Sequence, residues 1–214
     1  MKTIALIDYG SGNLHSAQRA LRVAAQQAGV ACDILVSGEP DVVAGADAIV
    51  LPGVGHFADC AANLHAVDGL VAALELAVLQ RGVPFFGICV GQQLLAREGH
   101  EDGVTPGLGW LDGVVDRITP GPGLRVPHMG WNELKLTRPH PVLAGLGAAP
   151  HVYFTHSYAF RDLPREHVAA TTDYGETIIA AVARDNIFAT QFHPEKSQTV
   201  GLQILSNFIL WSPS

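Results

Sequence analysis

The stretch VPFFGICVGQQ, residues 83–93, decides the fold of this chain. Its apolar first half predicts a buried strand over residues 83–88, and a helix is expected to start near Val90 with almost no linker between them. Residues 87–91, Gly-Ile-Cys-Val-Gly, have the form of a G-x-S-x-G nucleophile elbow with cysteine in place of serine. At such a sharp turn the side chain of Cys89 projects from the sheet, and the flanking glycines relieve crowding around a strained backbone.

Strand-like and helical patterns alternate on the amino-terminal side of this elbow. A helix is predicted over residues 13–28, ending at Gly29, and a long alanine-rich helical region over residues 58–80. Further strands are predicted over residues 3–7, 32–36 and 46–51. Short connections between strands and helices predict right-handed crossovers and therefore an α/β fold, with a mostly parallel, doubly wound central sheet and flanking helices.

The carboxy-terminal half has a different pattern. Proline and glycine interrupt residues 103–150, so the strands there are expected to be short. Residues 151–160 alternate like one strand, residues 177–183 and 187–192 flank a hairpin turn at 184–186, and a helix is predicted over 197–211. No repeat, low-complexity tract or linker separates this half from the first. We therefore expect one domain over residues 1–214, with extra antiparallel strands in its second half.

Composition and charge exclude several classes of protein. The formal net charge is −7 and no basic cluster is present, which argues against nucleic acid as a partner. The first apolar run breaks at Asp8, too early for a signal peptide, and no apolar stretch reaches the ~18 residues that a membrane span needs. The three cysteines are widely spaced with no CxxC pair, so we expect no disulfide framework, no metal site and a cytoplasmic location.

The elbow has candidate catalytic partners near the end of the chain. His193 and Glu195 follow a predicted strand, and residues two apart in an extended chain face the same side. The imidazole can take a proton from the Cys89 thiol and return it to a leaving group, while the carboxylate fixes the imidazole tautomer. The alternative is that Cys89 is a small core residue, which is the usual fate of a free cysteine.

Two backbone segments could stabilise an oxyanion beside Cys89. The amide of Val90 follows the nucleophile, where the start of a helix also favours a thiolate. The loop over residues 52–55 follows another strand, and glycines on both sides of Val54 permit unusual peptide orientations, so Gly53 and Val54 are candidate donors. The alternative is an ordinary turn between a strand and a helix. From these residues alone, the chain is expected to be an acyl-transfer enzyme with a thiol nucleophile.

Taken together, the motifs resemble the class I (triad) glutamine amidotransferases across nearly the whole chain. More narrowly, five blocks in order resemble the glutaminase subunits of imidazole glycerol phosphate synthases. These blocks are IDYGSGNL at 7–14, LPGVGHF at 51–57, VPHMGWN at 126–132, YFTHSY at 153–158 and QFHPEKS at 191–197.

The resemblance implies a glutaminase that needs no cofactor. Cys89 would attack the carboxamide of glutamine, the amides of Val90 and of Gly53 or Val54 would bind the oxyanion, and His193 would protonate the departing ammonia. Water activated by His193 would then release glutamate from the thioester. By motif position, the residues expected to hold glutamine are Gly55, Gln93, Glu101 and Ser157.

The resemblance also implies a partner chain, since ammonia released into water would be protonated and lost. This chain has neither a phosphate-binding GxxxxGK[ST] loop nor room for a synthetase domain. The expected partner is a (β/α)8-barrel cyclase, which forms a heterodimer and uses ammonia to make imidazole glycerol phosphate and an aminoimidazole carboxamide ribotide in histidine biosynthesis. Residues expected at that interface are Asn13, Met129, Trp131 and Lys196. Such glutaminases are nearly silent until the partner binds its nucleotide, through rearrangement of the loop at Gly53 and Val54.

Two other functions stay open on the sequence. A free-standing cysteine hydrolase on the same sheet would act on other substrates without a partner, and a non-catalytic subunit would use the fold as a scaffold. Trp131 could equally be a core residue, and Gln93 a solvated helix residue. The sequence departs from the family pattern at Gln92, where methionine is common, and at Thr155, where an aliphatic residue is common. Both departures adjoin residues expected to contact substrate, so they put affinity rather than catalysis in doubt.

Overall fold

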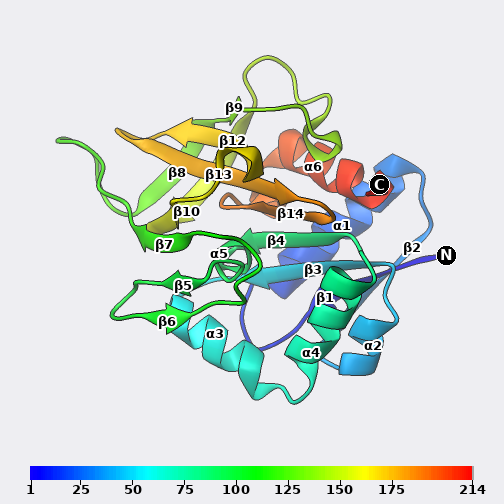
Figure 1. Ribbon diagram of the computed structural model, residues 1–214. Coiled ribbons are helices and arrows are strands. Elements are labelled where there is room, and N and C mark those ends of the chain that lie inside the picture. The colour runs from blue at the N-terminus through cyan, green and yellow to red at the C-terminus, as the bar shows by residue number, and fades with distance from the viewer. Residues whose placement is uncertain (214) are drawn as a thin grey trace.

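An eight-stranded sheet forms the centre of the protein in the computed structural model, which describes residues 1–213 (Figure 1). The sheet order is β2-β1-β3-β4-β14-β13-β12-β9. The first five strands are parallel: Cys32–Ser37, Lys2–Ile7, Ala48–Gly53, Phe85–Cys89 and Ile187–Thr190. The last three pair antiparallel: Thr177–Arg184, Val168–Asp173 and Lys135–Leu136. The predicted α/β class, with a mostly parallel sheet and antiparallel strands from the second half, is confirmed.

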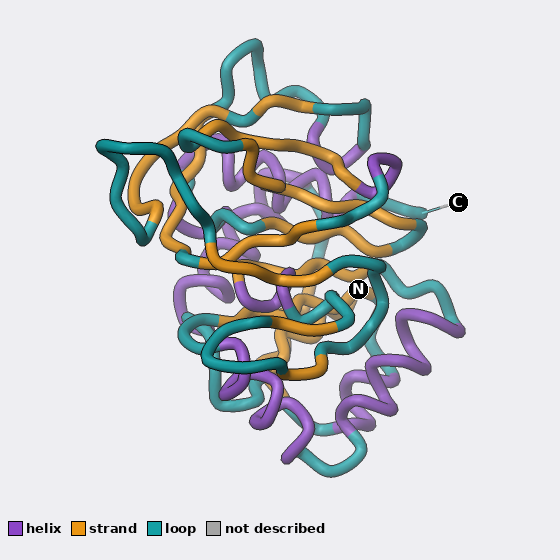
Figure 2. The backbone as a smooth tube through the Cα atoms, turned by 60° about the vertical axis from the view of Figure 1, so that its left-hand side comes forward, coloured by secondary structure: helices purple, strands orange, loops and turns teal. Residues whose placement is uncertain are grey.

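Helices cover both faces of this sheet, as Figures 1 and 2 show. Helix α1 (Leu14–Ala28) packs beside α6 (Gln198–Leu210) on one face. The helices α2 (Pro40–Ala44), α3 (Phe57–Ala66) and α4 (Leu70–Glu75) gather on the other. The phenylalanines of β4 mark the two sides, since Phe85 packs against Trp110 and Phe86 against Phe208 of α6. Strands buried on both faces explain why β3 and β4 are continuous apolar runs rather than alternating ones.

The ends of α1 follow from the sequence. The Asn13 side chain accepts a hydrogen bond of 3.2 Å from the Ser16 amide, which caps the first turn. Gly29 ends the helix at φ 67°, a left-handed conformation that glycine adopts without penalty. The predicted helix over residues 13–28 and the terminal helix are both confirmed. The hairpin between β13 and β14 is confirmed as well, with Asp185 in its turn at φ 50°.

Three predicted elements differ from the structure. The helical region over residues 58–80 is divided into α3, α4 and a π-helical segment over Leu76–Gln80, and the two parts lie at 93° to each other. The break follows from the extended backbone of Val67 and from Gly69 at φ 74°. The helix expected from Val90 is a single turn, α5 (Val90–Gln93), and α2 was not predicted at all.

The strand predicted over residues 151–160 is two strands in different sheets. Strand β10 (His151–His156) pairs with β8 (His128–Glu133), whereas β11 (Tyr158–Arg161) joins a four-stranded sheet with β7, β5 and β6. The bounds of these partners are Val114–Arg117, Glu98–Gly99 and Thr105–Pro106. Alternation continues across Ser157 although the hydrogen-bond partners change there, so the pattern alone could not reveal the break. Short 3-10 turns lie at Pro141–Leu143, Arg165–His167 and Pro194–Lys196.

Two further observations concern the described residues as a set. Over residues 1–213, no single helix is long and apolar enough to cross a membrane; only α3 taken together with Leu70–Gln80 passes that test, as a sharply bent pair. Within the same residues, no group of three or more His, Cys, Asp or Glu side chains is arranged to hold a metal ion.

Candidate active site

Cys89 occupies a strained turn where β4 ends and α5 begins. Its backbone has φ 56° and ψ −110°, a combination that costs a non-glycine residue free energy. The glycines on either side are sterically required: a Cβ on Gly91 would lie 1.9 Å from the Leu51 carbonyl oxygen, and one on Gly87 would lie 2.7 Å from the Gly91 carbonyl oxygen. The elbow is therefore packed directly against β3, and its side chain is fixed in direction.

His193 reaches Cys89 because β14 is the parallel neighbour of β4. Thr190 is in register with Ile88, so the chain that continues from β14 arrives at the carboxyl end of β4. His193 Nδ1 lies 2.7 Å from Glu195 Oε1, and the two side chains are only 2% and 3% exposed. The Ser197 hydroxyl donates a hydrogen bond of 2.6 Å to the His193 carbonyl, which holds this short segment in place. A buried carboxylate at this distance fixes the imidazole tautomer with its proton on Nδ1.

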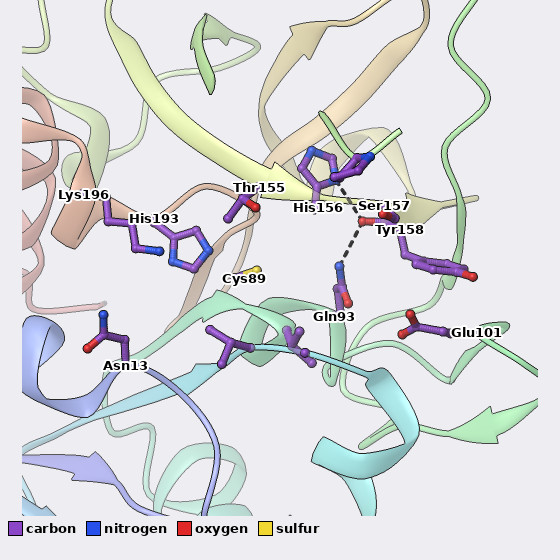
Figure 3. A pocket seen from close by; sticks show the side chains of 14 residues that line it. Asn13, Cys89, Gln93, Glu101, Thr155, His156, Ser157, Tyr158, His193 and Lys196 are labelled. Carbon is purple, nitrogen blue, oxygen red and sulfur yellow. Dashed lines mark hydrogen bonds between the residues drawn. The ribbon is translucent and has the colours of Figure 1, made fainter. Parts of the chain in front are cut away.

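The surroundings of His193 favour its protonated form. Burial opposes the charge, but the interactions with Cys89 and then with Glu195 raise the pKa of His193 to about 10. The Nε2 atom is buried and makes no hydrogen bond of good geometry, although it faces the Cys89 side of the site (Figure 3). An imidazolium beside a thiolate is the arrangement that an activated cysteine nucleophile requires.

A cavity of about 540 Å³ opens above Cys89 (Figure 3). Most of the residues predicted for the site line it together: Asn13, Val54, Gly55, Cys89, Val90, Gln93, Glu101, Ser157, His193 and Lys196. Glu195 lies behind His193, and Gly53 lies under the loop, where a Cβ would be 2.8 Å from the Gly91 amide nitrogen. Met129 and Trp131 are elsewhere, on β8, and are 62% and 48% exposed.

The candidate oxyanion loop is held from outside the cavity. The Val54 amide donates a hydrogen bond of 3.2 Å to the Ser11 hydroxyl oxygen, and this hydroxyl also lies 3.0 Å from the Val54 carbonyl oxygen. The Tyr9 hydroxyl donates to the Pro52 carbonyl at 2.7 Å. In this conformation the Val54 N–H group is therefore engaged by Ser11 and is not directed at Cys89. Its oxyanion role stays a prediction that requires this peptide to turn.

Gln93 and Glu101 are both fixed by hydrogen bonds. Gln93 is buried on the first turn after Cys89, so the alternative of a solvated helix glutamine is wrong. Its side-chain nitrogen donates to the Tyr158 carbonyl and to Gln191 Oε1, each at 3.0 Å. Glu101 Oε2 accepts a hydrogen bond of 2.8 Å from the Phe57 amide at the start of α3, and the residue also lines the cavity. An amide and a carboxylate thus face the cavity across from the nucleophile.

Comparison with known proteins places these features in a family. The glutamine amidotransferase class-I family model matches residues 5–211. The chain is 54% identical to imidazole glycerol phosphate synthase subunit HisH of Caulobacter vibrioides, over all of both chains, and 51% identical to the same subunit of Rhodospirillum rubrum, over 98% of this chain and 99% of the relative. The chain belongs to the HisH family of class I glutamine amidotransferases.

Solved structures of more distant amidotransferases share the fold. A putative GMP synthase protein from Thermoplasma acidophilum aligns with a TM-score of 0.70 at 23% identity, covering 98% of this chain and 92% of that one. A second glutamine amidotransferase aligns with a TM-score of 0.70 at 21% identity, covering 96% and 97%. At this level of identity the likeness supports the fold of the HisH family member and nothing finer.

Several residues of this amidotransferase site were missed by the sequence reasoning. Tyr158 contributes a backbone carbonyl, which no side-chain pattern can signal. His156 lines the cavity and is neutral, because burial lowers its pKa to about 3. Gln191 contacts the nucleophile itself, with its Nε2 atom 3.7 Å from Cys89 Sγ. Since Gln191 precedes His193 by two residues in an extended segment, the same spacing that linked His193 to Glu195 could have found it.

Proposed function

We propose that this chain hydrolyses glutamine to glutamate and ammonia as the glutaminase subunit of an imidazole glycerol phosphate synthase. Cys89 acts as the nucleophile, His193 as the acid and base, and Glu195 orients the imidazole. The observation that carries the proposal is the strained Cys89 elbow beside a buried His193–Glu195 pair at the floor of one cavity. The family membership supports the same reaction.

The first half of the reaction forms a thioester. With the pKa of His193 raised to about 10, the site holds an imidazolium beside the Cys89 thiolate near neutral pH. The thiolate attacks the carboxamide carbon of glutamine, and the carbonyl oxygen becomes an oxyanion that the Val90 amide binds. His193 gives its Nε2 proton to the nitrogen as the C–N bond breaks, which releases ammonia and leaves a glutamyl thioester on Cys89.

The second half restores the enzyme. His193, now neutral, takes a proton from a water molecule that attacks the thioester carbon. The C–S bond then breaks, which releases glutamate and regenerates the thiolate beside the imidazolium. Gly55, Gln93, Glu101 and Ser157 line the cavity and are proposed to hold glutamine in place during both halves.

We propose that the loop at Gly53 and Val54 sets when Cys89 can act. Its Val54 amide is bound to Ser11 in this conformation, so only the Val90 amide is free to serve the oxyanion. The loss of one oxyanion donor typically costs about 2.7–4 kcal/mol of transition-state stabilisation, or roughly 10²- to 10³-fold in rate. A turn of the Val54 peptide would supply the second donor and would raise turnover without moving the catalytic side chains.

The proposed partner is a cyclase with a (β/α)8 barrel, which forms a heterodimer with this chain and receives the ammonia. Met129 and Trp131 are exposed on β8, as residues of an interface core would be before the partner binds. Asn13 and Lys196 line the same cavity as Cys89, on the path that ammonia would leave by. The complex would act in the cytoplasm, in histidine biosynthesis, and would make imidazole glycerol phosphate and an aminoimidazole carboxamide ribotide. The whole chain, residues 1–214, would form its amidotransferase domain.

The deciding experiment is a glutaminase assay in three conditions: the chain alone, the chain with its barrel partner, and the pair with the nucleotide substrate of the cyclase. Glutamate release should rise steeply in the third condition and should be absent in a Cys89→Ala variant. No rise on adding partner or nucleotide would contradict the assignment to imidazole glycerol phosphate synthase. A Cys89 that a glutamine-like electrophile cannot alkylate would favour a scaffold role, and partner-independent hydrolysis of other substrates would favour a free-standing hydrolase.

A further inference from the structure

Gln191 is a completely buried polar residue to which the reaction above gives no role. It follows β14 directly, two residues before His193, and its solvent exposure is 0%. Its Nε2 atom donates a hydrogen bond to Cys89 Sγ at 3.7 Å. Burial of a carboxamide costs free energy unless its donors and acceptor are satisfied, so the partners of this side chain show what it is built to do.

The orientation of the Gln191 amide follows from its neighbours. The Tyr158 carbonyl oxygen can only accept hydrogen bonds, so Gln93 must turn its NH₂ group toward that oxygen. The same NH₂ group lies 3.0 Å from the outer oxygen of Gln191, which must therefore be the acceptor. The NH₂ group of Gln191 is then the end that faces Cys89. Figure 3 shows the first part of this chain, from the Tyr158 carbonyl to Gln93.

We propose that Gln191 is a further catalytic residue, whose N–H group stabilises the Cys89 thiolate and aims its sulfur. A thiolate accepts a hydrogen bond more strongly than a thiol does, so this donor favours the reactive form. Gln93 and the Tyr158 carbonyl act through Gln191 as positioning groups. The thiolate thus has two partners, an imidazolium from His193 and a neutral amide from Gln191.

The same arrangement determines what Gln93 can offer a substrate. Both N–H groups of Gln93 are used, one by Tyr158 and one by Gln191, so its Oε1 atom is left as an acceptor at the cavity wall. An acceptor there favours a group that carries N–H, such as a carboxamide or an ammonium, over a carboxylate. This consequence rests on the proposed function, because it takes glutamine as the occupant of the cavity.

The test uses the full-length chain and the pH dependence of Cys89 alkylation by iodoacetamide, followed by mass spectrometry of the Cys89 peptide. Gln191→Met keeps the volume and removes both polar ends. Gln191→Glu keeps an acceptor for Gln93 but turns an oxygen toward the thiolate. The midpoint of the alkylation profile should rise by about one pH unit in the first variant. It should rise further in the second, because a carboxylate repels a thiolate.

The other titratable groups that face Cys89 are His193, Tyr9 and Cys60, and they are unchanged in both variants. Alkylation of Cys60 in the same samples is the internal control and should not change. Gln93→Met gives a second route to the same readout, since it releases the Gln191 amide without removing it, and its shift should be smaller. Folded variants with the wild-type midpoint would overturn the proposal.

A parallel glutaminase assay with the partner and its nucleotide separates this inference from the proposed function. For Gln191→Met we expect kcat to fall about tenfold, as the loss of one hydrogen bond predicts, with KM little changed. Normal glutaminase activity with an unshifted midpoint would refute the role of Gln191 alone. A shifted midpoint in a chain whose wild type shows no glutaminase activity would refute the proposed function and leave the Gln191 contact standing.

Discussion

The conformation of Cys89 makes a prediction in which glycine stabilises the fold more than alanine does. Cys89→Ala and Cys89→Gly both remove the sulfur and its charge, so His193 and Gln191 lose the same partner in each. The variants differ only in Cβ, which the alanine keeps at φ 56° and ψ −110°. Because only glycine adopts such a conformation freely, the difference in stability measures the strain that the nucleophile carries.

The expected magnitude follows from two opposing contributions. A non-glycine residue in a sparsely populated backbone region costs on the order of 1–3 kcal/mol. Glycine loses more backbone entropy on folding, which costs about 0.5–1 kcal/mol relative to alanine. The difference leaves Cys89→Gly more stable than Cys89→Ala by roughly 0.5–2 kcal/mol. For a chain of this length that corresponds to a melting temperature roughly 1–8 °C higher.

The assay is urea unfolding of both inactive variants, followed by far-UV circular dichroism and checked by calorimetry. Cys60 supplies the matched control because it is a buried cysteine inside α3. There the order should reverse, with Cys60→Gly less stable than Cys60→Ala by about 1 kcal/mol. If Cys89→Gly proved equal to or less stable than Cys89→Ala, the elbow would carry no strain and this reasoning would be wrong.

Three further predictions concern catalysis, binding and acid stability. Glu195→Gln should lower kcat about 10²- to 10⁴-fold with little change in KM in a steady-state assay of the complex, because the imidazole loses the carboxylate that orients it; unchanged kcat would contradict this. Glu101→Ala should raise KM for glutamine and lower the free energy of unfolding by about 1 kcal/mol, since the first turn of α3 loses its acceptor; an unchanged urea midpoint would count against the second effect. The pKa values of His128 and His156 are lowered to about 4 and about 3 by burial, so only the unfolded state takes up their protons below pH ~6.5. Stability should therefore fall between pH ~6.5 and 4, and urea titrations that are flat over this range would refute it.

Much of the fold follows from local patterns in the sequence. Continuous apolar runs predict strands buried on both faces, and β3 and β4 are such strands. The helix over 13–28 is correct because its capping residues, Asn13 and Gly29, are themselves visible in the sequence. Alanine-rich composition, by contrast, does not show where a helix bends, and the turn at Gly69 depends on how α3 and α4 pack. The division at Ser157 depends on which strands pair with which, and this is set by tertiary contacts.

The candidate site divides in the same way. Cys89, His193 and Glu195 could be named because their chemistry depends on side-chain type and on spacing within a short segment. The backbone carbonyl of Tyr158 and the engagement of the Val54 amide by Ser11 depend on peptide orientation, which residue type does not determine. The carboxamide of Gln191 could have been found from its spacing to His193, but its direction required the positions of Gln93 and Tyr158.

The pairing of β4 with β14 has a consequence for insertions and deletions. The nucleophile and its base end two adjacent parallel strands, so their separation is set by one strand spacing, about 4.8 Å, rather than by the chain that joins them. Residues added to the surface loops between β4 and β13 would lengthen the connection without moving either end. A single residue added between Ile187 and His193 would instead turn the imidazole to the opposite face of the sheet. Length should therefore vary freely across the middle of such chains and hardly at all over these few residues.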